Sequence, residues 1–356
     1  MMVHDQLRIE VDGDEPTGLT ADLLGLEVEL DDQLAGMFRL TLALRMQPDG
    51  SWPYLDDDRF ALWRRVDIIG GPQDGTRQLI IGYVTHLRPD FGPDLDRCRL
   101  EVWGLDATVL MDRADRLRAW PNKTDSDIAT EVLRSYGLTP EVTGTDVVHD
   151  ERVSTVVQRE SDIRLLRRLA FRNGFSCYVD GDTAYFGPPR LEGGQLPPMA
   201  VQFGPRTNVE RFTLEVNAFT PTDVTMTQTD RLTGDVLRAE GRAELQRALG
   251  SRPPDDLGTL QVGQTVSTGE QEMSALCQSL YDEGQWFVTG EGEVLGNAYP
   301  AVLVPHALVP IKGIGATHSG VYEVTHVTHV FTPAGYRQRF RVRRNATQPT
   351  GEEDFG

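Results

Sequence analysis

The sequence is short of cysteine and of long apolar runs. Its three cysteines, Cys98, Cys177 and Cys277, lie far apart and form no CxxC or CxxH pair. Each sits in an apolar pattern, which predicts buried free thiols rather than a metal site. No stretch approaches the roughly 20 consecutive apolar residues that span a bilayer, and the first residues lack the basic and apolar segments of a signal peptide. We therefore expect no membrane insertion, and assembly in the cytoplasm.

Positive charge is scarce as well. The 356 residues include 35 Lys and Arg against 54 Asp and Glu, which gives a formal net charge of −19. Because Lys and Arg that neutralise phosphates supply most of the affinity for nucleic acids, this balance argues against nucleic-acid recognition. It fits a soluble component whose charge resists unwanted association.

Motifs of catalysis and cofactor binding are missing. There is no G-x-S-x-G, H-E-x-x-H or P-loop pattern. His326 and His329 would point to opposite faces of a strand, so they cannot bind one metal ion without a bulge. Length and patterning leave no room for a helical lysozyme lobe with paired carboxylates. The sequence therefore predicts no enzyme activity, no cofactor and no metal site.

The chain contains many short β patterns separated by Gly, Pro and Asp. Phe38, Leu40, Leu42 and Leu44 alternate with more polar residues, which indicates a half-buried strand. The next strands are expected without helices between them, a spacing typical of a barrel or sandwich, over 65–69, 78–87 and 97–103. After a Gly- and Pro-rich linker at 191–199, more strands are expected over 209–217, 222–228, 286–295, 301–311, 320–331 and 335–342. Helices are expected over 238–249 and 270–283.

Residues 158–190 combine a helix and a hairpin. Ser161 and Asp162 are suited to cap a helix with one apolar face, and Asn173-Gly174 is a strong stop. Strands are then expected over 175–179 and 183–186, joined by Asp180-Gly181 in a type I′ turn. A second amphipathic helix is expected over 124–138, and its Ser-Asp-Ile opening repeats that of the first. Convergent capping chemistry and an internal duplication both explain the repeat.

This helix-and-hairpin unit resembles the same unit in the family of phage late control D, VgrG and tail-spike hub proteins. The resemblance extends to the first half of the chain, where Gly82, Val84 and Asp106 match positions that close a barrel in that family. It extends also to the closing strands, with matches at Gly320, Tyr322, Val324, His329, Phe331 and Arg343 or Arg344. One departure is Pro305-His306, where relatives often have Pro-Gly.

The resemblance implies an α+β, mainly β fold with two tube-like β-barrel domains. The first barrel is expected over 1–118, a small α+β domain over 119–198, and the second barrel over 199–245 and 285–345. A loop and helix insertion is expected over 246–284, and a flexible tail over 346–356.

The implied function is that of a structural baseplate hub of a contractile tail or injection system. Such a hub is a homotrimer that adapts a six-fold inner tube to a three-fold spike, here without a fused spike. The partners would be further copies of the chain, the inner tube protein, a separate spike protein and baseplate wedge or adaptor proteins, all within a phage tail or injection-system particle. The alternatives are a tail-associated peptidoglycan hydrolase and a carbohydrate-binding β-protein.

Two arginine arrays are candidates for contact with a partner. One is a stripe on the helix of the helix-and-hairpin unit, Arg164, Arg168 and Arg172, with Arg167 beside it. The other occupies one face of the last strand, with Arg337, Arg339, Arg341 and Arg343. A solvated face explains the stripe as well as an interface does. The interface reading rests on the bidentate pairing of arginine with carboxylates.

Overall fold

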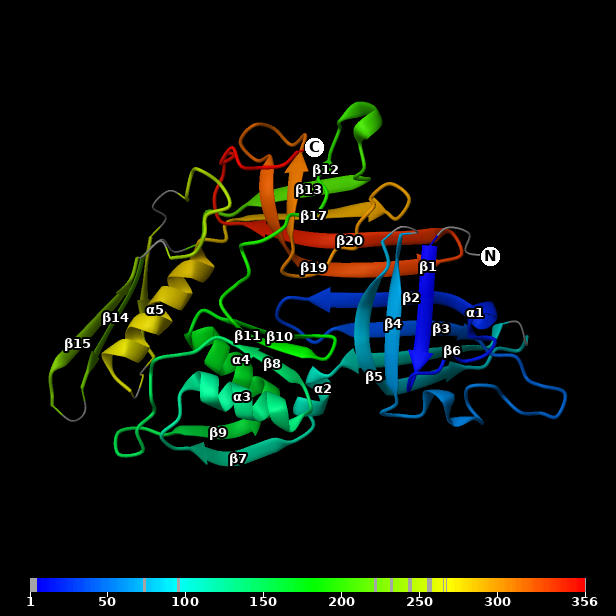
Figure 1. Cartoon of the computed structure of the whole chain (residues 1–356), viewed down its shortest axis with the longest axis horizontal. Helices are drawn as coiled ribbons and strands as arrows, with labels where there is room; N and C mark the ends of the chain where they lie inside the picture. Colours follow the sequence, from blue (N-terminus) through cyan, green and yellow to red (C-terminus); the bar gives the residue numbers. More distant parts are fainter. Residues whose placement is uncertain are drawn as a thin grey trace.

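The computed structural model of the chain describes residues 5–72, 75–94, 97–220, 223–230, 233–242, 245–254, 258–264, 266 and 268–355. With 43% strand and 16% helix, it confirms the mainly β, α+β class. Most strands join one large sheet, and the three longer helices lie in two smaller units beside it (Figure 1). Within the described residues, none of the helices combines the length and apolar content that crossing a membrane requires.

In the part of the chain that the structure describes, the large sheet has twelve strands, and it includes strands from near both ends of the chain. Its neighbours are antiparallel except for β12 and β18. Its main path runs in the order β1 (Asp5–Val11), β4 (Arg65–Pro72), β5 (Arg77–Asp90), β6 (Arg99–Asp106), β3 (Met37–Ala43), β2 (Leu23–Asp31), β19 (Gly320–Thr332), β20 (Gly335–Arg344), β17 (Val288–Leu295) and β13 (Arg211–Val216). Beside this path, β18 (Leu308–Lys312) pairs with β19 and with the short β12 (Met199–Ala200).

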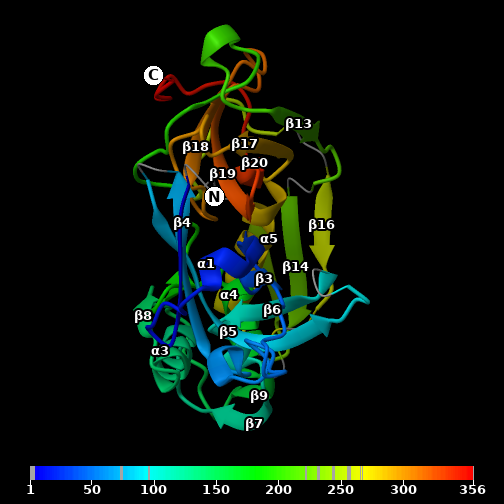
Figure 2. The same cartoon turned by 90° about the vertical axis from the view of Figure 1, so that its right-hand side faces the viewer.

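The two tube-like barrels expected from the sequence are not closed within the described residues. The hydrogen-bonded path is open and ends at β1 and β13. Strand β2 pairs with β19, which sets Leu26 opposite Phe331 and Leu30 opposite Val327. This pairing joins the strands expected for the two barrels into two halves of one sheet. Figure 2 shows the second half standing above the first.

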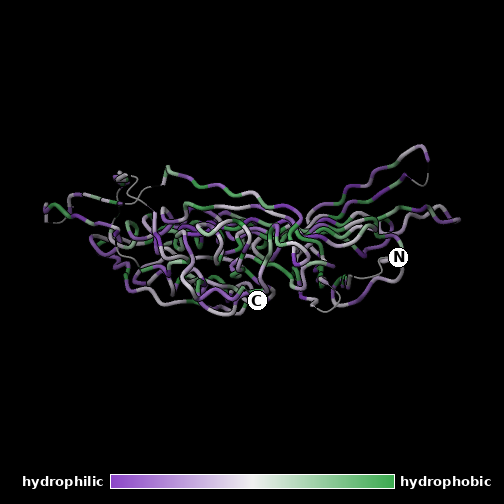
Figure 3. The backbone as a smooth tube through the Cα atoms, turned by 90° about the horizontal axis from the view of Figure 1, so that it is seen from above, coloured by the Kyte–Doolittle hydropathy of each residue, from purple (hydrophilic) through white to green (hydrophobic). Residues whose placement is uncertain are grey.

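Each half of the sheet has its own core. In the first half, the alternation of β3 is confirmed, because Phe38, Leu40 and Leu42 are fully buried. Gly104 is needed there, since a Cβ at this position would lie 2.2 Å from the Phe38 ring. In the second half, the core includes Tyr322. Seen from above, the molecule is elongated and narrow, with hydrophobic and hydrophilic segments alternating along its backbone (Figure 3).

Short helices accompany the large sheet. They are α1 (Leu19–Asp22), η1 (Asp58–Phe60), α2 (Thr108–Met111) and η3 (Gly204–Arg206). Gly82 and Asp106 lie opposite each other in β5 and β6. The buried carboxylate of Asp106 accepts hydrogen bonds from the backbone of Gly36 (2.6 Å) and from Thr108 (2.9 Å), and so ties β6 to the start of β3 and to α2.

The small α+β unit packs two helices between a ribbon and a sheet. The ribbon pairs β7 (Asp115–Trp120) with β9 (Val156–Ser161), and the sheet holds β10 (Ser176–Asp180), β11 (Thr183–Gly187) and β8 (Thr139–Val142). The helices are α3 (Asp125–Ser135) and α4 (Asp162–Arg172). Their apolar faces meet in one core, which buries Ile128, Leu165, Leu166 and Leu169 completely.

Two local predictions in this unit were wrong. Ser161 is at the N-cap of α4, but its hydroxyl donates to the Asp112 carboxylate instead of capping the helix. The hairpin is present, but Asp180 pairs with Thr183, so the two-residue turn is Gly181-Asp182. Only Gly181 there has a positive φ, at 62°. A type I′ turn needs positive φ at both positions.

A further unit packs one helix on a small sheet. Helix α5 (Glu270–Gly284) lies where a helix was expected and covers β15 (Val236–Gly241), β14 (Asp223–Thr229) and β16 (Thr259–Val262). The helix expected over 238–249 is wrong, because β15 occupies its start. Gly241 permits this strand to approach α5, since a Cβ there would lie 2.1 Å from the Cys277 carbonyl oxygen. Strands β14 and β15, expected in the second barrel, thus belong to this separate sheet.

Candidate partner-binding surface

The arginine row on β20 points away from the core of the second half. Strand alternation buries Gln338, Phe340 and Val342 and leaves the four arginines on the opposite face. Glu293 of the neighbouring β17 forms ion pairs with Arg337 (2.9 Å) and Arg339 (3.4 Å). The acidic partners of these two members therefore lie within the same chain.

Arg341 differs from its neighbours in the row. It is exposed and stands opposite Glu291 of β17 and His326 of β19. Within the part of the chain that the structure describes, it is the one member of the row without an ion pair. A shallow hollow of about 410 Å³ borders it. Arg341 is thus the member of the row that is most available to an external carboxylate.

The row belongs to a wider surface, which we call the polar sheet face. Residues directly opposite in a sheet share a face, so the register of the strands extends this surface from one half of the sheet to the other. Acidic residues lie on both sides of the basic row. On one side they belong to β17, next to β20. On the other side they belong to β2, beyond β19, where Asp31 (3.1 Å) and Glu29 (3.3 Å) contact His326 and Glu27 pairs with Arg39. The polar sheet face comprises Glu291, Glu293, Arg337, Arg339, Arg341, His326, Thr328, Glu27, Glu29 and Arg39.

The last member of the row, Arg343, lies in a buried charge cluster. Its guanidinium is 2.7 Å from Glu323 and 3.7 Å from both Asp32 and Glu283, and it stacks on Trp286. Burial opposes the charge on Arg343, but the three carboxylates outweigh it and raise the pKa of Arg343. This side chain is 12% exposed. It holds β20, β19, the end of β2 and α5 together.

The arginine stripe on α4 has partners within the chain too. Arg164 is 63% exposed and lies 3.3 Å from Asp112, and Arg168 is 2.7 Å from Glu160. Arg167, which lies beside the stripe, points inward and lines two cavities. Its Nε is buried without a hydrogen-bond partner among the described residues. Contact of the stripe with a partner stays a prediction.

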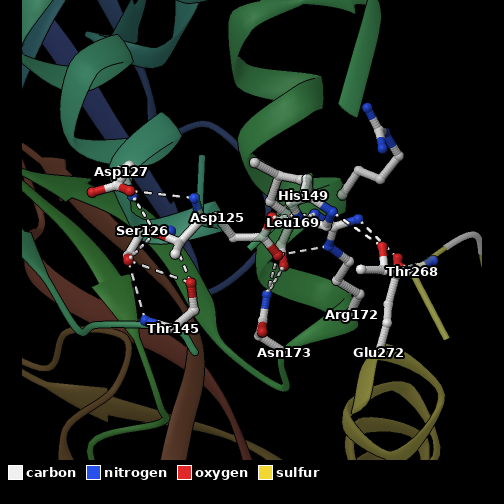
Figure 4. Close-up of polar contacts among 12 residues, drawn as sticks. Asp125, Ser126, Asp127, Thr145, His149, Leu169, Arg172, Asn173, Thr268 and Glu272 are labelled. Atoms are coloured by element: carbon white, nitrogen blue, oxygen red, sulfur yellow. Dashed lines mark hydrogen bonds and ion pairs between the residues drawn. The ribbon is translucent and has the colours of Figure 1, made fainter. Parts of the chain in front are cut away.

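Arg172 is the centre of a buried polar network that joins three helices (Figure 4). Its guanidinium donates to Asp125 at the start of α3 (2.6 Å) and to Glu272 of α5 (3.0 Å). His149 contacts the same Asp125 (2.9 Å) through Nε2 and Thr268 (3.2 Å) through Nδ1. Burial raises the pKa of Asp125, but the hydrogen bonds from His149 and Arg172 outweigh it and lower that pKa to about 2. The network fastens the α5 unit to the small α+β unit.

Sequence reasoning missed most of this network and of the Arg343 cluster. Asp125 and Glu272 look like ordinary acidic residues in the first turns of helices, where they are common. His149 lies in a loop without any motif. The one signal present was the spacing of Arg172, which put it on a helix face with other arginines. Its burial follows from the position of α5, which the spacing does not reveal.

The other sequence predictions about chemistry concern cysteine and histidine. All three cysteines are buried and free, as expected. His326 and His329 point to opposite faces, since His329 is fully buried and bonds Tyr336 (2.7 Å). Within the described residues, no group of three or more His, Cys, Asp and Glu side chains is placed to hold a metal ion.

Comparison with known proteins shows which family has this architecture. The model of one family, the phage tail baseplate hub (GPD), matches residues 31–332. The chain belongs to the phage tail baseplate hub family. This family is one of structural hub proteins, which points to a role without catalysis. A search of curated proteins finds no match.

Solved structures similar to this hub-family chain include tail and secretion proteins. A 43 kDa prophage tail protein from Shewanella oneidensis is 15% identical with a TM-score of 0.69, over 97% of this chain and 100% of that one. A tail protein from Neisseria meningitidis is 14% identical with a TM-score of 0.71, over 96% and 97%. A type VI secretion component from E. coli is 13% identical with a TM-score of 0.52, over 97% and 79%. At these identities the likeness concerns the fold.

Proposed function

We propose that the chain forms the homotrimeric hub of a contractile tail or injection system, which adapts a six-fold inner tube to a three-fold spike. The observation that carries the proposal is the polar sheet face, which runs across both halves of one sheet. Three copies of a sheet with two similar halves present six similar units around an axis. A ring of that kind meets a six-fold partner on one side and a three-fold partner on the other.

The open edges of the sheet support the ring. Strand β13 pairs only with β17, and the segment 86–90 of β5 pairs only with β6, so each has one free edge among the described residues. Free edges are templates for pairing with another chain. We infer that the edge of β13 in one copy meets the 86–90 edge in the next, which is a heterologous contact of the type that closes rings.

Charge supports a role in contact with other proteins rather than with nucleic acid. On the polar sheet face, acidic residues of β17 lie beside the arginine row of β20, so the face offers a phosphate backbone no purely basic surface. Arg341 is the group that we expect to pair with a carboxylate of the tube protein, the spike protein or a wedge or adaptor protein. The fold neighbours include a component of a type VI secretion system, and this supports assembly into a tail or injection particle.

The first test is the mass of the purified full-length chain by light scattering. We expect about 119 kDa, three times the 39.6 kDa of one chain. A monomer at micromolar concentration that is also absent from the native particle by imaging would refute the hub proposal. Clearing of a peptidoglycan gel by the monomer would favour the hydrolase, and glycan binding by the monomer would favour the carbohydrate-binding protein.

The edge contact has a test with a matched control. Asn217 donates its N–H to Phe287 next to β17, so the N–H of the preceding Val216 points to the free edge. Val216→Pro removes that donor without breaking the pairing of β13 with β17, whereas Val216→Ala keeps it. We expect Val216→Pro to shift the mass toward the monomer and Val216→Ala to remain trimeric. Equal masses for the two variants would exclude β13 from the ring contact.

A further inference from the structure

His306 has an unusual environment for a histidine. It adopts φ 66°, a left-handed conformation that few residues other than glycine use. Its side chain is 7% exposed and its ring stacks on Tyr178 at a centroid distance of 4.0 Å. Both ring nitrogens are without a hydrogen-bond partner among the described residues. Buried polar atoms nearly always have hydrogen-bond partners. The two ring nitrogens of His306 are therefore an exception that requires an explanation.

The groups around His306 come from three parts of the fold. It belongs to the loop before β18, and its backbone N–H donates to Val324 of β19 (2.8 Å). Tyr178 belongs to β10 of the small α+β unit. A cavity of about 60 Å³ next to the ring is lined by all three parts, including Leu30 of β2 and Arg167 of α4. His306 therefore lies where the two halves of the large sheet meet the small α+β unit.

The charges at this junction are unbalanced. The Glu323 carboxylate is fully buried, and its Oε1 has no hydrogen-bond partner but lies 3.7 Å from Nδ1 of His306. With Asp32 and Glu283, it makes three carboxylates around the single guanidinium of Arg343. With all three ionised and His306 neutral, the cluster has a net charge of −2. Protons that bind here reduce this net negative charge, which is only partly buried, because the side chains of Glu323 and Asp32 are 0% and 11% exposed whereas that of Glu283 is 56% exposed.

The remaining charged groups near the ring balance this charge only in part. Asp31 is engaged with His326 and Arg77 with Asp180. Asp106, which also lines the cavity, has its pKa raised by burial. Arg167 lines this cavity and also the cavity beside Asp32 and Glu283, so it supplies one further positive charge near the cluster.

We propose that His306 and Asp32 form a proton-binding site that tightens this three-way junction as the pH falls from about 7.5 to about 5.5. A proton on His306 places a positive charge 3.7 Å from the buried Glu323 carboxylate, and this contact replaces a missing partner. The site regulates how firmly the three parts of the chain are held. It does not depend on the proposed assembly, because every group named belongs to one chain.

The titration of Asp32 has the sign that the proposal requires. Burial raises the pKa of Asp32 to about 6, although Arg343 and His306 act against the rise. A carboxyl whose pKa is raised on folding destabilises the folded state when it ionises, so its contribution to stability is lost as the pH rises through about 6. Burial also raises the pKa of Glu283, with the same sign. Burial raises the pKa of Glu323, but the nearby His306 and Arg343 outweigh it and lower that pKa, so the carboxylate stays ionised over this range.

The test compares the full-length chain with two variants in a hydrogen-exchange experiment at pH 7.5 and 5.5. His306→Asn removes the imidazole ring but tolerates the left-handed backbone, and Asn at this site keeps a polar side chain. Asp49→Asn is the control, since Asp49 is exposed in the loop after β3. After correction for intrinsic exchange rates, we expect protection of the peptide around 304–308 to rise about ten-fold on acidification in the wild type and in Asp49→Asn. His306→Asn should show less than half of that rise.

An equal rise in His306→Asn, or no rise in the wild type, would overturn the proposal. If His306→Asn fails to fold, Asp32→Asn tests the proposal instead. The Asn side chain is neutral at both pH values, so the protection of the peptide around 304–308 should rise less on acidification than in the wild type. A full rise in Asp32→Asn would exclude Asp32 from the site. The buried His329 is common to all these proteins, so its own pH response cancels in the comparison.

Discussion

The buried network around Arg172 allows a sharp test of how the α5 unit is attached. Arg172→Met keeps the length of the side chain but removes its charge. Arg172 is 14% exposed, and the side chains of its partners Asp125 and Glu272 are 4% and 11% exposed. Removal of one partner from a buried ion pair costs about 3–5 kcal/mol. Because Asp125 keeps donors on His149 and Asn173, we expect about 3 kcal/mol.

The assay must report on this attachment, because the chain has several cores and does not have to unfold in one step. Hydrogen exchange of α5 at pH 7 measures the free energy of local opening. The control is Arg164→Met, whose side chain is 63% exposed beside Asp112. An exposed pair contributes about 0–1 kcal/mol. The reasoning would be refuted if the two variants raised exchange of α5 by the same amount.

The network also predicts a dependence on acid. Asp125 has its pKa lowered to about 2, so its contribution to stability is present above the usual value near 3.9 and is lost as the pH falls through about 2. In Arg172→Met this pKa moves back toward its usual value. We therefore expect the difference in α5 exchange between wild type and variant to shrink between about pH 4 and pH 2. A difference that stayed constant over this range would exclude Asp125 as the electrostatic partner.

Three further predictions concern single buried positions. Gly241→Ala places a Cβ against the Cys277 carbonyl of α5, so it should lower the free energy of unfolding in urea by about 1–3 kcal/mol. The control Gly263→Ala, with open space around it, should change that free energy by no more than about 0.5 kcal/mol. Burial lowers the pKa of His329 to about 3, so its ring should show no titration by NMR between about pH 5 and 8, and a midpoint near 6.5 would contradict its burial. Burial raises the pKa of the Cys177 thiol to about 12, so a thiol reagent should modify it only in urea, and rapid modification of the native protein would be the contrary result.

Much of the local structure could be predicted from the sequence. The alternation in β3, the amphipathic helices α3 and α4, and the hairpin of β10 and β11 depend on residues a few positions apart. Such patterns follow from the periodicity of strands and helices, which depends only on residues that are close in the sequence. The errors concern short segments whose partners lie elsewhere in the chain. Ser161 donates to Asp112, 49 positions away, and β15 is a strand because it pairs with β14.

Only part of the candidate surface could be predicted from the sequence. Period-two spacing placed four arginines on one face of β20, and the structure confirms that face. Which of them are free depends on Glu293 of β17 and on the cluster around Glu323, elements that reach β20 only through the fold. The same holds for the stripe on α4. Arg164 is 63% exposed, whereas Arg172 is only 14% exposed because it pairs with Glu272 of α5.

By itself, then, the sequence determined the mainly β class, the helix-and-hairpin unit and the resemblance to hub proteins, because each rests on patterns within short segments. Only the tertiary structure decided that β2 pairs with β19, nearly 300 residues later, and thereby makes one open sheet of two expected barrels. It alone also decided which charges are buried together around Arg172 and Arg343. Pairing register and burial depend on which distant segments meet, and no local pattern of side chains specifies that.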